Sequence, residues 1–291
     1  MDILSLFEEL PPAKPRASSP IMDNTPIEKV AGWENLWVKR EDLCSPHPGP
    51  SFSKIRGVYS HISKRPENLI GVLDTYHSKA GWAVSYVCSL LGKQCLDFYP
   101  RYQADPEGVL RYPQEMAVAH GAELFPLKAG RSSILFHSAK RETLRRGGYL
   151  MPNALKLPET VDENQAEVVR TSGMQEYDHV VLSISSATIA TGVLKGIASL
   201  GLNPQIWLHM GYDRSEEEIR RYMAKYQPLG YTFNISFINE RYGYKDEARV
   251  GAWPAPSFPC NPYYDLKAWR WLVTEGLAQM QGRVLFWNIG S

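Results

Sequence analysis

Short apolar runs alternate with helix-length amphipathic segments through the first half of the chain. The apolar runs predict strands at residues 36–39, 69–73, 95–99 and 123–127. The segments that separate them predict helices at residues 53–63, 80–91, 113–120 and 134–145. Because strands that alternate with helices pair in parallel, we expect an α/β fold whose mainly parallel sheet is covered on both faces.

A second set of elements follows with the same alternation. We expect strands at residues 179–184, 205–210 and 284–287, and helices at residues 159–171, 190–200, 215–226 and 266–279. Residues 242–264 are rich in proline and aromatic side chains and predict an irregular stretch. Two sets of elements favour two domains, each with a mainly parallel, twisted sheet flanked by helices.

The predicted boundaries divide the chain into three parts. Residues 1–48 form an N-terminal arm, rich in Pro, Ser and Ala up to about residue 20, together with part of the large domain. Residues 49–150 form a small α/β domain, and residues 151–291 form the rest of the large one. We expect the chain to cross between the domains near Pro152 and Asn153.

Composition narrows the class of protein. The 291 residues carry a formal net charge of +1 and are 44% hydrophobic, which is typical of a globular protein and argues against non-specific wrapping of nucleic acid. The four cysteines form no C-x-x-C pair, and Cys44 with His47 offers too few ligands for a metal, so we expect none. The first ten residues lack a basic, apolar leader, and the longest apolar runs are strand-sized, so we expect a cytoplasmic protein.

Lys54 is the first candidate for chemistry. It follows the Gly-, Pro- and Ser-containing loop G-P-S-F-S at residues 49–53 and stands at the mouth of a predicted helix. A rigid element can hold such a lysine while its amine faces a cleft, where an amine can form a Schiff base. Taken alone, a lysine at a helix start is more often a solvated surface residue.

A phosphate site is the second candidate. Ser185, Ser186, Ala187 and Thr188 lie between a predicted strand and a predicted helix. Backbone N–H groups at a helix N-terminus, together with small hydroxyl side chains, suit a phosphate dianion. A plain Ser/Thr cap of the helix is the alternative.

Several segments, in order along the chain, resemble a known family. They are T-P-I at 25–27, V-K-R-E-D-L at 38–43, S-F-S-K-I-R-G at 51–57, H-G-A-E at 120–123, N-P-Y-Y-D-L-K-A at 261–268 and V-L-F-W-N-I-G-S at 284–291. Together they resemble the fold-type II pyridoxal-phosphate enzymes, the tryptophan synthase β-like family, and most closely its ACC deaminase and D-cysteine desulfhydrase group. The resemblance implies that Lys54 carries pyridoxal 5′-phosphate as an internal aldimine. It also makes a homodimer possible, because many members of the family are dimers.

The resemblance implies roles for further residues. Asp265 matches the acidic residue of the deaminase group and would face the pyridine nitrogen, which favours a quinonoid intermediate; a helix N-cap is the alternative. Tyr264 would transfer a proton or position a nucleophile. His77 stands where the family has an Asn that contacts the cofactor's phenolic oxygen, and Ser78 with Lys79 would meet the substrate carboxylate. The chain departs from the family by placing Ser and Ala in the usually glycine-rich phosphate loop and by changing the carboxylate loop at residues 74–82.

Three functions remain open from the sequence. The first is a lyase or deaminase that acts at the Cα of a free small amino acid through the Lys54 aldimine. The second is a decarboxylase or lyase acting on an amino acid attached to a modified thymine in phage DNA, which would place the enzyme in the host cytoplasm. The third is a non-catalytic scaffold that binds pyridoxal phosphate.

The changed carboxylate loop supports the second function, as do aromatic and arginine residues expected near the cleft entrance. Aromatic rings can stack on a base and arginines can meet phosphate. The residues concerned are Tyr76, Trp82, Tyr99, Arg101 and Tyr102.

Overall fold

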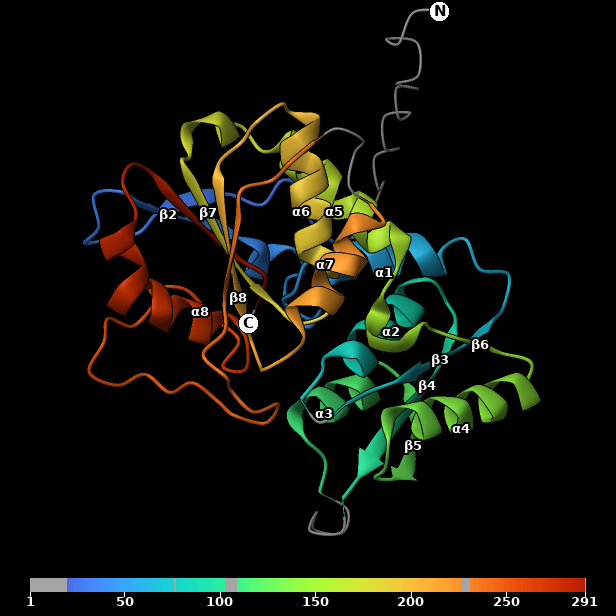
Figure 1. The fold of residues 1–291 in the computed structure, drawn as a ribbon. Helices are drawn as coiled ribbons and strands as arrows, with labels where there is room; N and C mark the ends of the chain where they lie inside the picture. The colour runs from blue at the N-terminus through green and yellow to red at the C-terminus, as the bar shows by residue number, and fades with distance from the viewer. Residues whose placement is uncertain (1–19, 76, 103–108, 227–230, 291) are drawn as a thin grey trace, which may run out of the picture.

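Two β-sheets carry the fold and lie in two lobes of the molecule (Figure 1). The structure, a computed structural model, describes residues 20–75, 77–102, 109–226 and 231–290. The larger sheet has the order β1 (Ile27–Lys29), β2 (Leu36–Arg40), β10 (Val284–Asn288), β7 (His179–Ile184), β8 (Gln205–Met210) and β9 (Ile235–Ile238). The smaller sheet has the order β5 (Ala122–Lys128), β4 (Gln94–Arg101), β3 (Leu69–Leu73) and β6 (Tyr149–Leu150).

Helices cover both faces of both sheets (Figure 1). They are α1 (Lys54–Ile62), α2 (Ala80–Leu90), α3 (Tyr112–Ala119), α4 (Ser132–Arg145), α5 (Pro158–Arg170), α6 (Thr188–Ser199), α7 (Glu216–Ala224) and α8 (Asp265–Trp271). Every strand pair in the described part of the chain is parallel except β1 with β2. The predicted α/β class with mainly parallel sheets is therefore confirmed.

Successive side chains along one strand point to opposite faces of the sheet, and both faces are buried. On β7, Val180 and Leu182 join the core built with α6, whereas Val181 joins the core built with α8. On β3, Val72 packs with α1 and α2, whereas Leu73 packs with α4. Because both faces are apolar, the strands show the continuous hydrophobic runs typical of parallel sheets rather than a polar alternation.

Three strands and one helix differ from the sequence prediction. The sequence does not predict strands β1, β6 and β9, because they have only three, two and four residues and little apolar periodicity. The helix predicted at residues 266–279 is wrong beyond Trp271, since Leu272–Gly276 forms a π-helical turn and Leu277–Gln279 a 3₁₀ turn. Gly276 lies against the Trp271 ring, so closely that an added Cβ would stand 3.1 Å from it.

The domain boundaries stay a prediction. The strands from residues 49–150 make the smaller sheet, and the strands from either side of that range make the larger one. Helix α1, however, packs against both α2 and α5, so it joins the two lobes. The predicted arm lies in residues 1–19, outside the described part of the chain. No helix in the described part is long and apolar enough to cross a membrane.

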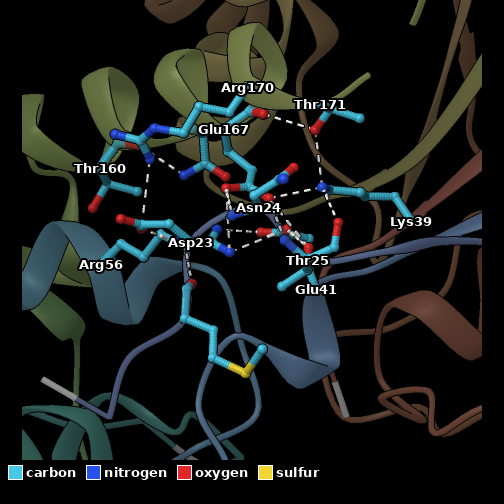
Figure 2. A network of polar contacts seen from close by, with 12 residues as sticks. Asp23, Asn24, Thr25, Lys39, Glu41, Arg56, Thr160, Glu167, Arg170 and Thr171 are labelled. Carbon is cyan, nitrogen blue, oxygen red and sulfur yellow. Dashed lines mark hydrogen bonds and ion pairs between the residues drawn. The ribbon is translucent and has the colours of Figure 1, made fainter. Parts of the chain in front are cut away.

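A buried ion network fixes α1 to the larger lobe, with Glu167 of α5 at its centre (Figure 2). Lys39 of β2 places its Nζ 2.7 Å from Glu167 Oε1, and Arg56 of α1 places Nη2 3.6 Å from Oε2. The backbone N–H groups of Asn24 and Thr25 donate to the same carboxylate at 2.8 Å. Burial alone would raise the pKa of Glu167, but the charges of Arg56 and Lys39 lower it to about 2.

Glu41 extends this network to the turn after β2. Arg56 Nη1 donates to Glu41 Oε2 at 2.5 Å, and the Thr25 hydroxyl also donates to the Glu41 carboxylate. Burial acts against the charge of Arg56, but Glu41 and its other acidic neighbours hold the guanidinium pKa above its usual value. The T-P-I and V-K-R-E-D-L segments therefore meet each other and α1, rather than the cavity described below.

We expect Glu167→Gln to destabilise the fold by about 3–5 kcal/mol, because it removes the negative carboxylate that the buried side chains of Lys39 and Arg56 both contact. Urea unfolding would measure this change. Glu217→Gln is the matched control: its side chain is 81% exposed and its pair with Arg221 lies within one helix, so we expect a change below about 0.5 kcal/mol. Equal unfolding midpoints for the two variants would contradict the central role of Glu167.

Candidate active site

A cavity of about 570 Å³ lies between the two lobes. Its walls come from the carboxyl ends of strands in both sheets, which include the segments after β3, β4, β7, β8 and β10. Crevices at the carboxyl ends of parallel strands are where open α/β sheets bind ligands. A volume of this size lies within the range of small-molecule sites.

Lys54 opens α1 and lines this cavity. Its Nζ donates to the Ala154 carbonyl at 3.0 Å and to Ser186 Oγ at 3.2 Å. Burial, and then the nearby charge of Lys156, lower the pKa of Lys54 to about 8. At neutral pH the amine therefore exchanges readily between its protonated form and its nucleophilic form.

The N-terminus of α6 forms a second wall. Ser185, Ser186, Ala187 and Thr188 all line the cavity, and Ser186 Oγ lies 3.1 Å from Thr188 Oγ1. No side chain caps α6 among the described residues, so the expected alternative of a plain Ser/Thr cap is not found. The first N–H groups of this helix are therefore available to an anion in the cavity.

Ala187 holds the turn into α6 in an unusual conformation. Its φ of +61° lies in the left-handed region that glycine adopts without strain. Where the family usually has a glycine-rich loop, this chain therefore has an alanine in a backbone conformation that favours glycine.

Two cations that no sequence motif predicts stand beside this loop. Arg214 donates from Nη1 to the Ser185 carbonyl, and it lines the cavity together with Lys156. Burial, and then repulsion by Arg214, lower the pKa of Lys156. A bound dianion would relieve this repulsion. Both cations lie in loops that carry no motif, so only the fold brings them to the helix N-terminus.

Asp265 faces the cavity from the first residue of α8. Ser183 Oγ and the Ile289 backbone N–H both donate to its Oδ1 at 3.0 Å. It does not act as the predicted alternative, a helix N-cap, because no side chain of the described residues caps this helix. Burial raises its pKa to about 7 despite these two hydrogen bonds. A cationic partner in the cavity would return the carboxyl to its charged form.

Tyr264 and His77 form a pair across the two lobes. His77 Nε2 and the Tyr264 hydroxyl are 2.9 Å apart, and the His77 ring stacks on Tyr263 at 3.9 Å. Burial lowers the pKa of His77 to about 4 and raises that of Tyr264 well above its usual value. Both groups therefore stay neutral near pH 7, and the hydroxyl keeps its proton.

Ser78 and Lys79 stand at the N-terminus of α2 and also line the cavity. Ser78 Oγ accepts a hydrogen bond from the Ala80 N–H at 3.0 Å, so it also ties the first turn of this helix. Burial lowers the pKa of Lys79 to about 8, and the charge of Asp265 acts in the opposite direction. The described lining of the cavity thus includes three lysines of lowered pKa, Lys54, Lys79 and Lys156.

A buried pair of carboxyl groups lies beneath the same helix, and no sequence pattern predicts it. Asp74 lines the cavity, and burial raises its pKa to about 7. Asp97, on β4, is fully buried, and burial and then Asp74 raise its pKa well above the usual value. An added Cβ on Gly81 would stand 2.2 Å from Asp97 Oδ2, so glycine is needed at this position of α2.

Only some of the residues predicted near the cleft entrance line the cavity. Tyr102 lines the cavity, whereas Tyr99 and Arg101 are not among its described lining residues. The prediction is wrong for Trp82, which lies in the apolar core under α2 and donates from Nε1 to the Pro48 carbonyl. Tyr76 lies outside the described residues.

The cavity fits pyridoxal 5′-phosphate by its chemistry. A lysine amine is available for the aldehyde, an uncapped helix N-terminus with two neighbouring cations for the phosphate, and a buried carboxyl for the ring nitrogen. The three groups belong to Lys54, the turn at residues 185–188, and Asp265.

Comparisons with known proteins identify the family of the chain. The family model described as "Pyridoxal-phosphate dependent enzyme" matches residues 18–220. A curated relative, the "Glycyl-dTMP PLP-dependent decarboxylase" of Pseudomonas phage M6, is 52% identical, and the match covers 93% of this chain and 100% of the relative.

Solved structures show the same fold. An ACC deaminase homologue has a TM-score of 0.78 at 16% identity, with 94% of this chain and 90% of that chain covered. The processed form of threonine deaminase isoform 2 from Solanum lycopersicum has a TM-score of 0.63 at 13% identity, with 93% of this chain and 84% of that chain covered. The resemblance seen in the sequence is thus confirmed, and the chain belongs to the family of pyridoxal-phosphate-dependent enzymes.

Proposed function

We propose that the protein is a decarboxylase whose substrate is an amino acid joined to a thymidine nucleotide. The observation that carries this proposal is the phage decarboxylase, which matches nearly the whole of this chain at 52% identity and is named for glycyl-dTMP. Of the three functions left open by the sequence, this is the second. Membership of the enzyme family, together with this relative, argues against the non-catalytic scaffold.

Each part of the cofactor has candidate residues. We assign covalent attachment to Lys54, the phosphate to the turn at residues 185–188 with Lys156 and Arg214 beside it, and the ring nitrogen to Asp265. Bound pyridoxal phosphate withdraws the electron pair that a breaking bond leaves at Cα. We expect His77 to lie on the phenolic side of the ring, because it stands where the family has the Asn that contacts the phenolic oxygen; its Nε2 lies 2.9 Å from the Tyr264 hydroxyl.

The proposed reaction breaks the bond between Cα and the carboxylate. Carbon dioxide leaves, the electron pair stays at Cα, and one proton is taken up there, so the product is an amine. Lys54 Nζ is the candidate donor of this proton, because its pKa of about 8 leaves the amine mostly protonated at pH 7 and still able to give the proton up. Tyr264 keeps its own proton and orients by hydrogen bonding.

The deaminase alternative differs in the bond that breaks and in the size of the substrate. A deaminase of a small free amino acid releases ammonia and a keto acid. The segment at residues 74–82, which departs from the family's carboxylate-binding loop, also supports a substrate other than the usual free amino acid. The larger, nucleotide-linked substrate is therefore the better match.

We expect Lys54→Ala to lose covalent attachment of pyridoxal phosphate and all turnover. The measurement is borohydride reduction of the loaded protein, followed by mapping of the labelled peptide. Lys79→Ala is the matched control, since Lys79 lies in the same cavity and its pKa is lowered to the same value of about 8. Labelling should persist at Lys54 in that variant; a label on Lys79 in the unaltered protein would overturn the assignment.

We expect Asp265→Asn to lower kcat by roughly 10²-fold, the scale of losing one preorganised electrostatic contact. The amide keeps the shape of the side chain but cannot hold a charge beside the ring nitrogen. Ser183→Ala is the control: it removes one hydrogen bond to Oδ1 and leaves the carboxyl, so its kcat should fall less. A wild-type kcat in Asp265→Asn, with cofactor still bound by its visible absorbance, would contradict the role of Asp265.

The substrate is tested by offering glycyl-dTMP and free amino acids to the loaded enzyme in parallel. We expect carbon dioxide and a nucleotide amine in equal amounts from glycyl-dTMP, without ammonia. Ammonia and a keto acid from a free amino acid, with no carbon dioxide from the nucleotide, would establish the deaminase function instead.

A further inference from the structure

Three tyrosines line the cavity and come from both lobes. Tyr102 follows β4, Tyr212 follows β8, and Tyr244 belongs to the irregular segment before α8. The Tyr212 and Tyr244 rings meet edge to face, with centroids 5.1 Å apart. We call these three residues the tyrosine wall.

Contacts with the smaller lobe hold Tyr244 of the tyrosine wall in place. The Tyr244 hydroxyl donates to Thr75 Oγ1 at 2.8 Å, and its ring lies 4.6 Å from that of His77. These contacts join the irregular segment of the larger lobe to the loop after β3 in the smaller one. Aromatic surfaces that are already ordered lose little conformational entropy when a ligand stacks on them.

Cations accompany the tyrosine wall. Lys245 Nζ lies 3.9 Å from the centre of the Tyr102 ring, and the Arg111 guanidinium lies 5.9 Å from it. Arg214 lies 5.7 Å from the Tyr212 ring. The carboxylates among the described lining residues are Asp74 and Asp265, both deeply buried. The cavity thus has an aromatic wall with Arg214 in its described lining, while Lys245 and Arg111 lie against the Tyr102 ring without being among the lining residues.

We propose that the tyrosine wall and Lys245 bind the nucleotide part of the substrate. This inference rests on the proposed function and deepens it. The pyrimidine lies against the tyrosine rings. Every base has a flat π-face that stacks on aromatic side chains, and this stacking does not depend on the hydrogen-bonding groups at the edge of the base. The phosphate lies near Lys245, whose ammonium is attracted to it as a point charge.

The position of the tyrosine wall fits such a ligand. Lys54 and the tyrosine wall line the same cavity, so an amino acid bound at Lys54 and the nucleotide joined to it can lie in one cavity. The net charge of only +1 argues against contacts with a long run of phosphates. We therefore infer recognition of one nucleotide unit, whether it is a free monophosphate or one residue of a DNA strand.

The test measures the Kd of dTMP for the enzyme loaded with pyridoxal phosphate, by titration calorimetry. We expect Tyr212→Leu to weaken dTMP binding by about tenfold or more, as removal of a stacking ring does. Lys245→Ala should remove the preference for dTMP over thymidine. Cofactor absorbance should stay unchanged in both variants.

Matched controls lie outside the cavity lining. Tyr112→Leu removes a tyrosine that is 54% exposed and packs edge-on against Trp82, and Lys64→Ala removes a lysine whose side chain is 64% exposed. Both should bind dTMP as the unaltered enzyme does. If Tyr212→Leu is poorly folded, the Kd of dTMP is measured for Lys245→Ala and Tyr102→Leu instead, and weaker binding in both supports the nucleotide site.

Failure of the nucleotide site is distinguishable from failure of the proposed function. Decarboxylation of glycyl-dTMP together with unchanged dTMP binding in the tyrosine and lysine variants would overturn the nucleotide site alone. Weakened dTMP binding in those variants without any decarboxylation would support the nucleotide site and contradict the decarboxylase. A single-stranded thymidine oligonucleotide that binds more tightly than dTMP, and is weakened by the same variants, would support the site and identify DNA as the source of the nucleotide.

Discussion

The buried carboxylate of Glu167 is the contact on which the cavity depends. It binds Lys39 from β2, Arg56 from α1 and the backbone of residues 24–25 in one place, away from solvent. Arg56 stands two residues after Lys54, so the network that holds the guanidinium also fixes the first turn of α1. A lysine is flexible, but its backbone is not free here. The amine can reach the cavity reproducibly because the helix that carries it is fastened to the other lobe.

The last residues of the described chain connect the two ends of the proposed cofactor site. The Ile289 N–H donates to Asp265, while its carbonyl accepts from the N–H of Ser53, next to Lys54. Gly290 pairs with Phe52 in an isolated bridge. The residue assigned to the ring nitrogen and the residue assigned to the aldehyde are therefore held in register by one strand end, β10, at the middle of the larger sheet.

The sequence predicts the fold class because it depends on local signals, and the motif-bearing residues that it singles out line one cavity, although their roles stay predictions. Strands and helices follow from apolar periodicity, and Lys54, Ser186 and Asp265 lie in short segments with recognisable order. Lys156, Arg214, Tyr212 and Tyr244 cannot be predicted in this way, since they lie in loops that only the tertiary fold brings together, whereas Tyr102 is predicted near the cleft and does line the cavity. The prediction of Trp82 at the entrance is wrong because an aromatic residue near a motif is more often core.

The left-handed backbone at Ala187 affects the stability of the folded chain as well as the shape of the site. An L-residue with a Cβ loses about 1–2 kcal/mol in that conformation, and a natural domain has only about 5–15 kcal/mol of stability in total. This one turn therefore lowers the free energy of unfolding by a noticeable fraction of its total. Cofactor that binds only the folded form raises this free energy by mass action. The supply of cofactor in the cell thus helps set how much of this protein survives proteolysis.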